Sequence, residues 1–134
     1  MTIIALPWPH PSLSPNSRKD RRAATPHRKA YREAGFYAAK EAGAEIHENA
    51  ELAIKFFPPD RKRRDLDNML ASIKAGLDGI ALAACVDDSG WMLSIEKSEP
   101  VKGGAVLIQV RQPREDNWQH IGSIVERMIN GKVA

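Results

Sequence analysis

The sequence has little that would support a disulfide, a thiolate metal site or a membrane span. Cys85 is the only cysteine among 134 residues, so one chain cannot form an intrachain disulfide or a zinc site of several thiolates. The four histidines show no metal-ligand spacing. No apolar run approaches the roughly 18 to 20 residues that span a bilayer, and prolines interrupt the N-terminal stretch too early for a signal peptide. We therefore expect a cytoplasmic protein without a membrane partner.

Acidic residues are scarce in the first quarter of the chain. Residues 1–32 contain seven Lys or Arg and one Asp, a net charge of +6, whereas the whole chain carries +3. The cations form two blocks, residues 18–32 and 61–64. Such clusters suit a polyanion, because phosphate contacts release counterions and attract the ligand over a distance; two solvated surface loops are the alternative. The candidate nucleic-acid contacts are Arg18, Lys19, Arg21, Arg22, Arg61, Lys62, Arg63 and Arg64.

The length and the 43% hydrophobic content predict one compact domain. Hydrophobic periodicity and turn residues predict strands, with a hairpin-type turn at 102–104, and helices, the first starting at Thr25-Pro26 and ending at Gly43. The expected strands are 3–8, 50–58, 91–99 and 105–112, and the expected helices are 26–42, 66–84 and 118–130. This order predicts an α+β fold, a β-α-β-α-β-β mixed sheet with helices packed on it, in a single domain spanning 1–134.

The C-terminal segment adds a helix beyond that core. We divide the chain into a core at 1–112 and a C-terminal helical extension at 113–134. Apolar residues at helical spacing in this extension favour packing against the core, and a dimer contact is the alternative. Trp8 and Trp91 are expected in the core or an interface, and Cys85 is expected to be a small buried side chain.

The stretch "PPDRKRRDLDNML" places cations directly before Asp65 and Asp67. Two residues apart, these carboxylates point about 200° apart on a helix but to one side on extended backbone. If a helix begins near Leu66, both can face one point at its N-terminus. Asp87 and Asp88 follow the same helix and reach this point only if the fold returns there. The alternative is that Asp65 and Asp67 cap the helix and pair with the arginines.

Converging carboxylates beside a basic surface suggest metal-assisted chemistry on phosphodiesters. Mg²⁺ and Mn²⁺ are hard ions that prefer carboxylate oxygens and water as ligands. Such an ion can polarise a phosphoryl oxygen and activate a water. The cations would bring the DNA backbone onto a site that is negative until it binds metal.

The motifs "LPWPHPSLSPNSR", "PPDRKRRDLDNM", "KAGLDGI", "VDD" and "KGG", in this order over residues 5 to 110, resemble the RusA family of Holliday-junction resolvases. The resemblance implies a homodimeric, Mg²⁺-dependent endodeoxyribonuclease of DNA recombination and repair. Its expected substrate is four-way junction DNA, cut by paired symmetric nicks, in a bacterial or phage-infected cell, many members being phage or prophage encoded. It implies metal-binding and catalytic roles for Asp65, Asp67 and Asp88, and a catalytic or phosphate-contacting lysine on the second helix.

The chain departs from the family pattern at that lysine. The position that matches it is Ala71, and the only lysine on the helix is Lys74, one turn further on the same face. Lys74 is therefore the candidate, with an ordinary surface lysine as the alternative. Asn68 is expected to orient a ligand carboxylate. The longer N-terminal loop weakens any correspondence at Asn16.

Two other functions compete with this interpretation. A non-catalytic nucleic-acid binding module would use the basic blocks alone, but acids beside them would weaken its phosphate contacts. A different metal-dependent nuclease of the restriction type would use Asp60 and Lys62 as a D-x-K motif, although they lie in a proline-flanked loop. For a resolvase, a C2 dimer is the simplest way to present two equivalent sites, and "IIALPWP", "WMLSI" and the N-terminal loop are its expected interface.

Overall fold

The computed structural model describes residues 2–17, 21–111 and 119–131. Two short 3-10 helices, η1 and η2, accompany the regular elements. In chain order, the elements are β1 (Thr2–Pro7), η1 (Pro11–Leu13), α1 (Arg21–Glu41), β2 (Glu51–Phe57), α2 (Leu66–Ser72), α3 (Lys74–Ala84), η2 (Asp88–Gly90), β3 (Met92–Lys97), β4 (Ala105–Arg111) and α4 (Gln119–Asn130).

The four strands form one mixed sheet in the order β1-β4-β2-β3, which confirms the predicted α+β class. β4 runs antiparallel to both β1 and β2, whereas β3 runs parallel to β2. The expected hairpin between β3 and β4 is wrong, because β2 lies between them. Gly103 and Gly104, with φ of 81° and 71°, still turn the chain. The α2–α3 crossover takes β3 to the outer edge of β2, and β4 then fills the place between β1 and β2.

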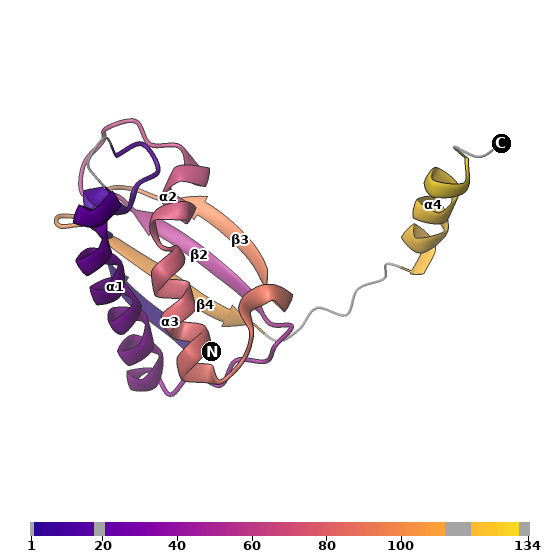
Figure 1. Ribbon diagram of the computed structural model, residues 1–134, viewed down its shortest axis with the longest axis horizontal. Coiled ribbons are helices and arrows are strands. Elements are labelled where there is room, and N and C mark those ends of the chain that lie inside the picture. Colours follow the sequence, from indigo (N-terminus) through magenta and orange to yellow (C-terminus); the bar gives the residue numbers. More distant parts are fainter. Residues whose placement is uncertain (1, 18–20, 112–118, 132–134) are drawn as a thin grey trace.

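The helices α1 and α3 cover one face of the sheet (Figure 1). Alternation along β2 buries Leu52, Ile54 and Phe56 on this face and leaves Lys55 exposed, as the sequence predicts. α1 and α3 approach each other closely through glycines. A Cβ at Gly79 would collide with the α1 backbone at the Arg32 carbonyl. The close crossing therefore depends on residues without side chains.

The first helix starts earlier than predicted. α1 begins at Arg21, so Pro26 lies inside it rather than at its first position. A proline there removes one backbone hydrogen bond. The buried Tyr31 hydroxyl donates a hydrogen bond of 2.8 Å to the Pro7 carbonyl at the end of β1. Burial raises the pKa of Tyr31. The C-terminal end of α1 follows the prediction, because the chain turns just after the helix at Gly43, which has φ 63°.

The predicted helix 66–84 consists of two helices, α2 and α3, separated at Ile73 with φ −101° and ψ 6°. The Ser72 hydroxyl donates to the Asn68 carbonyl at 2.8 Å, one turn back. Such bonds compete with the helical ladder and bend helices. Leu77 and Ile80 are buried, but Leu66 is 37% exposed. α3 ends at Cys85 in a left-handed conformation, and this cysteine is exposed, contrary to expectation.

α4 does not pack on the core, which corrects the prediction for the extension. Figure 1 shows it well away from the sheet and its helices. Its apolar side chains Ile124, Val125, Met128 and Ile129 are between 44% and 67% exposed. The apolar spacing indicated a helix correctly but did not specify what covers it. In the described part of the chain, no helix is both long and apolar enough to cross a membrane.

Candidate metal and nucleic-acid site

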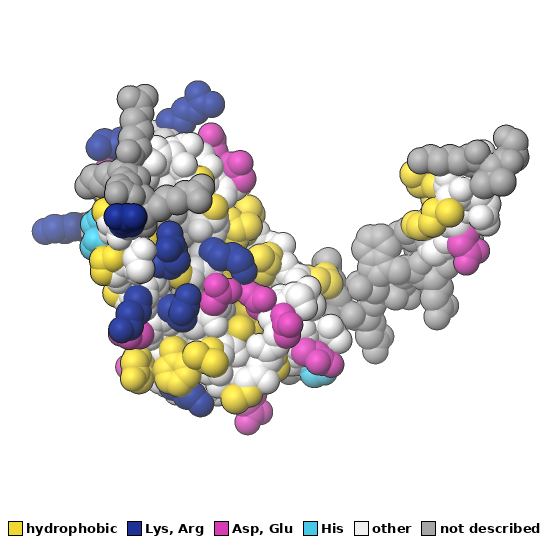
Figure 2. Space-filling model, in the orientation of Figure 1, with side chains coloured by type: hydrophobic (Ala, Val, Ile, Leu, Met, Phe, Trp, Pro, Cys, Tyr) yellow, Lys and Arg dark blue, Asp and Glu magenta, His cyan; other side chains and the backbone are white. Residues whose placement is uncertain are grey.

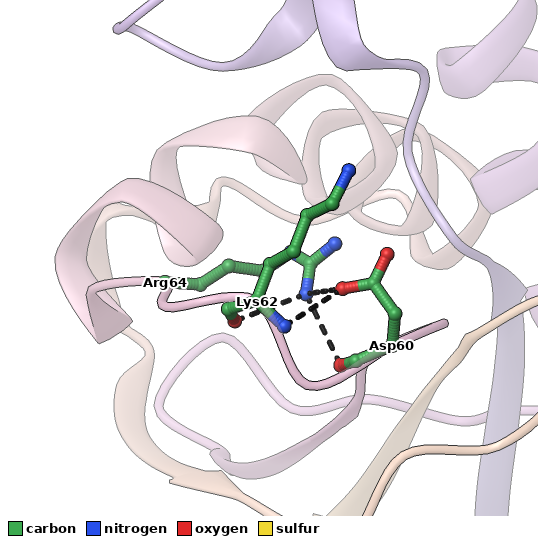
Figure 3. Close-up of polar contacts among 3 residues, drawn as sticks. All are labelled: Asp60, Lys62 and Arg64. Carbon is green, nitrogen blue, oxygen red and sulfur yellow. Dashed lines mark hydrogen bonds and ion pairs between the residues drawn. The ribbon is translucent and has the colours of Figure 1, made fainter.

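The loop that carries the cations Arg61 to Arg64 is held together by hydrogen bonds within the loop itself (Figure 3). The Asp60 carboxylate accepts a hydrogen bond of 2.8 Å from Arg64 and one of 2.9 Å from the Lys62 backbone. Arg64 also donates to the carbonyls of Asp60 and Lys62, both at 3.3 Å. The bond from Arg64, followed by that from the Lys62 backbone, holds the pKa of Asp60 below its usual range. Asp60 therefore shapes this loop.

Arg64 is the least exposed cation of the run, with 22% of its side chain exposed. Its guanidinium carbon lies 5.5 Å from the centre of the Trp8 ring. Trp8 in turn packs edge-on against Phe56, and a Cβ at Gly104 would collide with it. These contacts place Trp8 in the packing of the molecule, as expected. They also mean that Arg64, a predicted DNA contact, is already engaged within the protein.

The other three cations of the run face solvent. Arg61 pairs with Glu99 at 3.0 Å, but both side chains are about 80% exposed, and such pairs contribute little. Figure 3 shows the Lys62 ammonium pointing away from the contacts around Asp60. Arg63 is 94% exposed, and its Nε lies 4.0 Å from Asp65. This leaves Arg61, Lys62 and Arg63 available at the surface.

The first basic block is described only in part. Arg18 and Lys19 lie outside the described residues, and of Arg21 only its place at the start of α1 is described. Arg22 follows in the first turn and is exposed. On the face seen in Figure 2, Lys and Arg side chains gather over the helices, with a group of Asp and Glu side chains directly beside them.

Asp65 lies on extended backbone immediately before α2, with φ −87° and ψ 139°. The predicted approach to the helix is thus confirmed. Its side chain makes no capping hydrogen bond, and it is 60% exposed. Asp67 follows in the first turn and is also exposed. Helix capping therefore does not account for the Asp65 carboxylate, which is directed to the surface.

The fold places Lys74 next to Asp88 of the "VDD" motif. Lys74 Nζ lies 3.3 Å from Asp88 Oδ2, across the link from α3 to η2. The same ammonium lies 3.2 Å from Asp78 Oδ1, one turn along α3. The hydrogen bond to Asp78 is the main cause that raises the pKa of Lys74, and the bond to Asp88 adds to it. Lys74 is therefore a protonated cation at neutral pH and not a general base.

Asp87 and Asp88 have different surroundings. The Asp87 carboxylate accepts a hydrogen bond of 2.9 Å from the Ser89 backbone, which begins η2, and hydrogen bonding to Ser89 lowers the pKa of Asp87. Asp88 faces Lys74 instead and is 29% exposed. Of the two acidic residues Asp87 and Asp88, Asp88 is the one that contacts Lys74. Asp78 was missed by the sequence reasoning, although its spacing of four from Lys74 is a helical-pair signal.

The donor chemistry around this site fits a hard divalent cation. Asp65, Asp67 and Asp88 offer carboxylate oxygens, the ligands that Mg²⁺ and Mn²⁺ prefer. Over residues 2–17, 21–111 and 119–131, no three His, Cys, Asp or Glu side chains lie together as a group that could hold a metal. The structure thus brings Asp88 to Lys74 but does not gather Asp65, Asp67 and Asp88 into such a group.

Two adjoining hollows lie beside Asp65 and Lys74, and neither lining includes Asp67 or Asp88. The smaller, about 360 Å³, contains Asp65, Asn68 and Asn16. The larger, about 620 Å³, contains Lys74 and Asp78. Both hollows include Ser72 in their lining, so they meet at the end of α2. Asn16 thus lies in the same hollow as Asp65, despite the longer loop before it.

Comparison with known proteins gives one informative relative. No protein-family model matches the chain. A protein of Xylella fastidiosa, described as an uncharacterized protein, is 41% identical over 119 residues, which cover 82% of this chain and 76% of the relative. Identity of this extent over most of both chains means a shared fold and ancestry. The chain belongs to the same family as this Xylella fastidiosa protein.

Proposed function

We propose that this chain is a metal-dependent, structure-specific endodeoxyribonuclease that resolves four-way DNA junctions by paired nicks, as its resemblance to the RusA family implies. Its role would lie in DNA recombination and repair, in a bacterial or phage-infected cell. The observation that carries the proposal is the contact of 3.3 Å between Lys74 and Asp88. It joins the segment after the D-L-D-N motif to the "VDD" motif, fourteen residues away.

In this proposal Asp65, Asp67 and Asp88 hold Mg²⁺, or Mn²⁺ in its place. When bound, the ion would polarise a phosphoryl oxygen and lower the pKa of an attacking water. Lys74, which stays protonated, would move from Asp88 to a phosphate oxygen once metal neutralises the carboxylates. Asn68 lines the same hollow as Asp65 and would orient its carboxylate.

The exposed cations of the loop would bind the DNA backbone. Arg61, Lys62 and Arg63 are the contacts that the loop leaves available, whereas Arg64 would support them by keeping the loop closed. Replacing Arg61, Lys62 and Arg63 together by Gln should weaken DNA binding and reduce its log–log salt dependence by roughly 0.9 for each lost phosphate contact on a duplex.

The test of catalysis is cleavage of a labelled synthetic four-way junction with Mg²⁺ and with chelator. Asp67→Asn should abolish cleavage and leave junction binding intact or tighter, because it removes a metal ligand and a negative charge. Asp65→Asn and Asp88→Asn should behave alike. Asp87→Asn is the matched control, since an Asn side chain keeps an acceptor for the Ser89 N–H and Asp87 does not face Lys74.

Mg²⁺-dependent nicking by Asp67→Asn at the wild-type rate would remove the carboxylate site from the proposal. A wild-type protein that binds the junction equally with and without Mg²⁺, and never cuts it, would instead be a nucleic-acid binding module. The restriction-type alternative has little support, because Asp60 is already bonded to Arg64 and to the Lys62 backbone.

Paired nicks require two sites, and a C2 homodimer would supply them. The outer strands of the sheet, β1 and β3, carry the exposed apolar side chains Ile3 and Leu93, at 53% and 43% exposure. Among the described residues of the predicted interface, these are the large hydrophobic side chains that are exposed, whereas Trp91 is buried and donates to the His47 carbonyl. Sedimentation equilibrium without DNA tests this, and a 14.9 kDa monomer that makes single nicks would contradict paired resolution.

A further inference from the structure

The larger of the two hollows is a basic groove from which the catalytic proposal uses Lys74 alone. It lies between the η1 segment, the first turns of α1, and the junction of α2 with α3. Arg22, Arg28 and Lys74 line it, and Asp78 is the one carboxylate among the lining residues that the structure describes. Arg28 is exposed, and it belongs to the basic block 18–32 but not to the eight candidate nucleic-acid contacts named from the sequence. The groove therefore carries an excess of positive charge beside the candidate carboxylates.

The form of the groove suits a chain backbone better than a base. Its lining includes alanines on three helices, which let a ligand come close to the helix backbones. The Ser14 hydroxyl also lines it. None of the described lining residues is aromatic, whereas sites that stack bases rely on aromatic side chains. Cations and hydroxyls are the groups that contact phosphates.

The size of the groove limits what enters it. A volume of about 620 Å³ is in the range of small-molecule pockets, so it accommodates a few linked sugar–phosphate units and not a duplex. The groove also adjoins the smaller hollow, in which Asp65 and Asn68 lie, because Ser14 and Ser72 line both hollows. A strand lying in the groove could therefore extend toward Asp65.

We propose that this groove binds the sugar–phosphate backbone of a single DNA strand and guides that strand to the Asp65 side of the site. The inference rests on the proposed function, since it takes the substrate to be DNA. It adds a strand-binding site on the α1 side, separate from the Arg61–Arg64 loop. Ala71, which stands where the family has a lysine, lines this groove and keeps it open.

The test is the binding of a fluorescently labelled single strand, measured by anisotropy over a salt series in chelator. Arg28→Ala should weaken binding several-fold and reduce the log–log salt slope by about 0.7, the value for one phosphate contact on a single strand. Lys29→Ala is the matched control, because it removes the same charge from the same turn of α1 but lines neither hollow. Its effect should be smaller, and its slope should stay near that of the wild type.

A second pair of variants blocks the groove instead of removing charge. Ala71→Glu places bulk and negative charge in it at an exposed position, whereas Ala30→Glu makes the same change at an exposed position of α1 outside it. Ala71→Glu should lower single-strand affinity at least as much as Arg28→Ala, and Ala30→Glu should not. Circular dichroism and thermal melting of each variant establish that it is folded.

Three results would overturn the inference. They are equal effects of the groove and control variants, an absence of single-strand binding by the wild type, and displacement of the strand by millimolar inorganic phosphate, which would mark a small-anion site. Failure of the proposed function is distinguishable. A wild type that binds the strand through Arg28 but never cuts a junction retains the groove and loses the nuclease.

Discussion

α3 and α4 are helices of similar length with apolar residues at the same spacing, yet only α3 is packed. In α3, Leu77 and Ile80 are 4% and 0% exposed, whereas in α4 Met128 and Ile129 are 67% and 64% exposed. α3 lies against α1 and the sheet, and α4 stands away from both (Figure 1). Apolar periodicity therefore indicates a helix with an apolar face, but it does not indicate which surface covers that face.

The difference lies in what each helix meets. α3 is positioned by the crossover from β2 to β3 and crosses α1 where glycines allow the backbones to approach. A Cβ at Gly122 of α4 would meet no described atom within 4 Å apart from its chain neighbours and the nearby backbone of its own helix. The apolar face of α4 is thus free for a dimer contact, the other interpretation of this segment. The following experiments compare the two environments, beginning with the largest expected effect.

Truncation of one apolar residue in each helix should separate them most clearly. Ile80→Ala should lower the free energy of unfolding by about 2 to 5 kcal/mol, because it leaves a cavity in the core. Ile129→Ala should change it by less than about 0.5 kcal/mol. Urea denaturation followed by circular dichroism measures both. A large loss for Ile129→Ala that grows with protein concentration would show that α4 is buried in an oligomer.

Adding a methyl group should have opposite effects in the two helices. Gly79→Ala forces the new Cβ against the Arg32 carbonyl, so α1 and α3 must separate, at a cost of about 1 to 3 kcal/mol. Gly122→Ala should stabilise α4 by about 0.5 to 1 kcal/mol, since alanine favours the helix and meets no neighbour. Thermal melting at fixed concentration gives both changes, and a destabilising Gly122→Ala would mean that this side of α4 is covered.

Within α1, the buried and exposed tyrosines offer the same comparison. Tyr31→Phe should cost about 1 kcal/mol, because the Pro7 carbonyl loses its donor. Tyr37→Phe, at a position 67% exposed, is the control and should cost almost nothing. The raised pKa of Tyr31 adds a pH dependence. Its contribution to stability is complete below the ordinary value of 10.0 and is lost as pH rises above it.

Denaturation of the wild type and Tyr31→Phe between pH 8 and 11 checks the sign. The wild type should lose its advantage over the variant as the pH passes about 10, the ordinary tyrosine pKa. An advantage that grows with pH would contradict the buried neutral phenol.

The smallest effect is expected in the exposed loop before α2. Asp60→Asn weakens the bond to Arg64 that closes this loop, so the variant should melt slightly earlier at neutral pH. The pKa of Asp60 is lowered from 3.8, so its contribution is present above that pH and is lost as the pH falls through the lowered value. Glu99→Gln, in an exposed pair with Arg61, is the control. A melting difference for Asp60→Asn that persists at pH 2 would contradict the role of its charge.

Part of the site followed from the sequence. The D-x-D spacing placed Asp65 on extended backbone before a helix, and the backbone angles confirm it. Lys74 was selected as the only lysine on the predicted helix 66–84, on the same face as Asp67 and Ala71, and it contacts Asp88. The four cations Arg61 to Arg64 are not equally exposed, because the Arg64 guanidinium packs over the Trp8 ring. Arg28 was placed only in the basic block 18–32 and not among the candidate contacts, since nothing local distinguishes it from its neighbours on α1.

The sequence by itself determined the order of the elements, the buried face of β2 and the turn at Gly103 and Gly104, because these depend on local propensity and on periods of two and 3.6 residues. Only the tertiary structure decided that β4 enters between β1 and β2, and that α4 finds no partner on the core. It also decided that Asp88 returns to Lys74. These outcomes depend on contacts between distant segments, whose free energies compete across the whole chain and leave no mark at a single position.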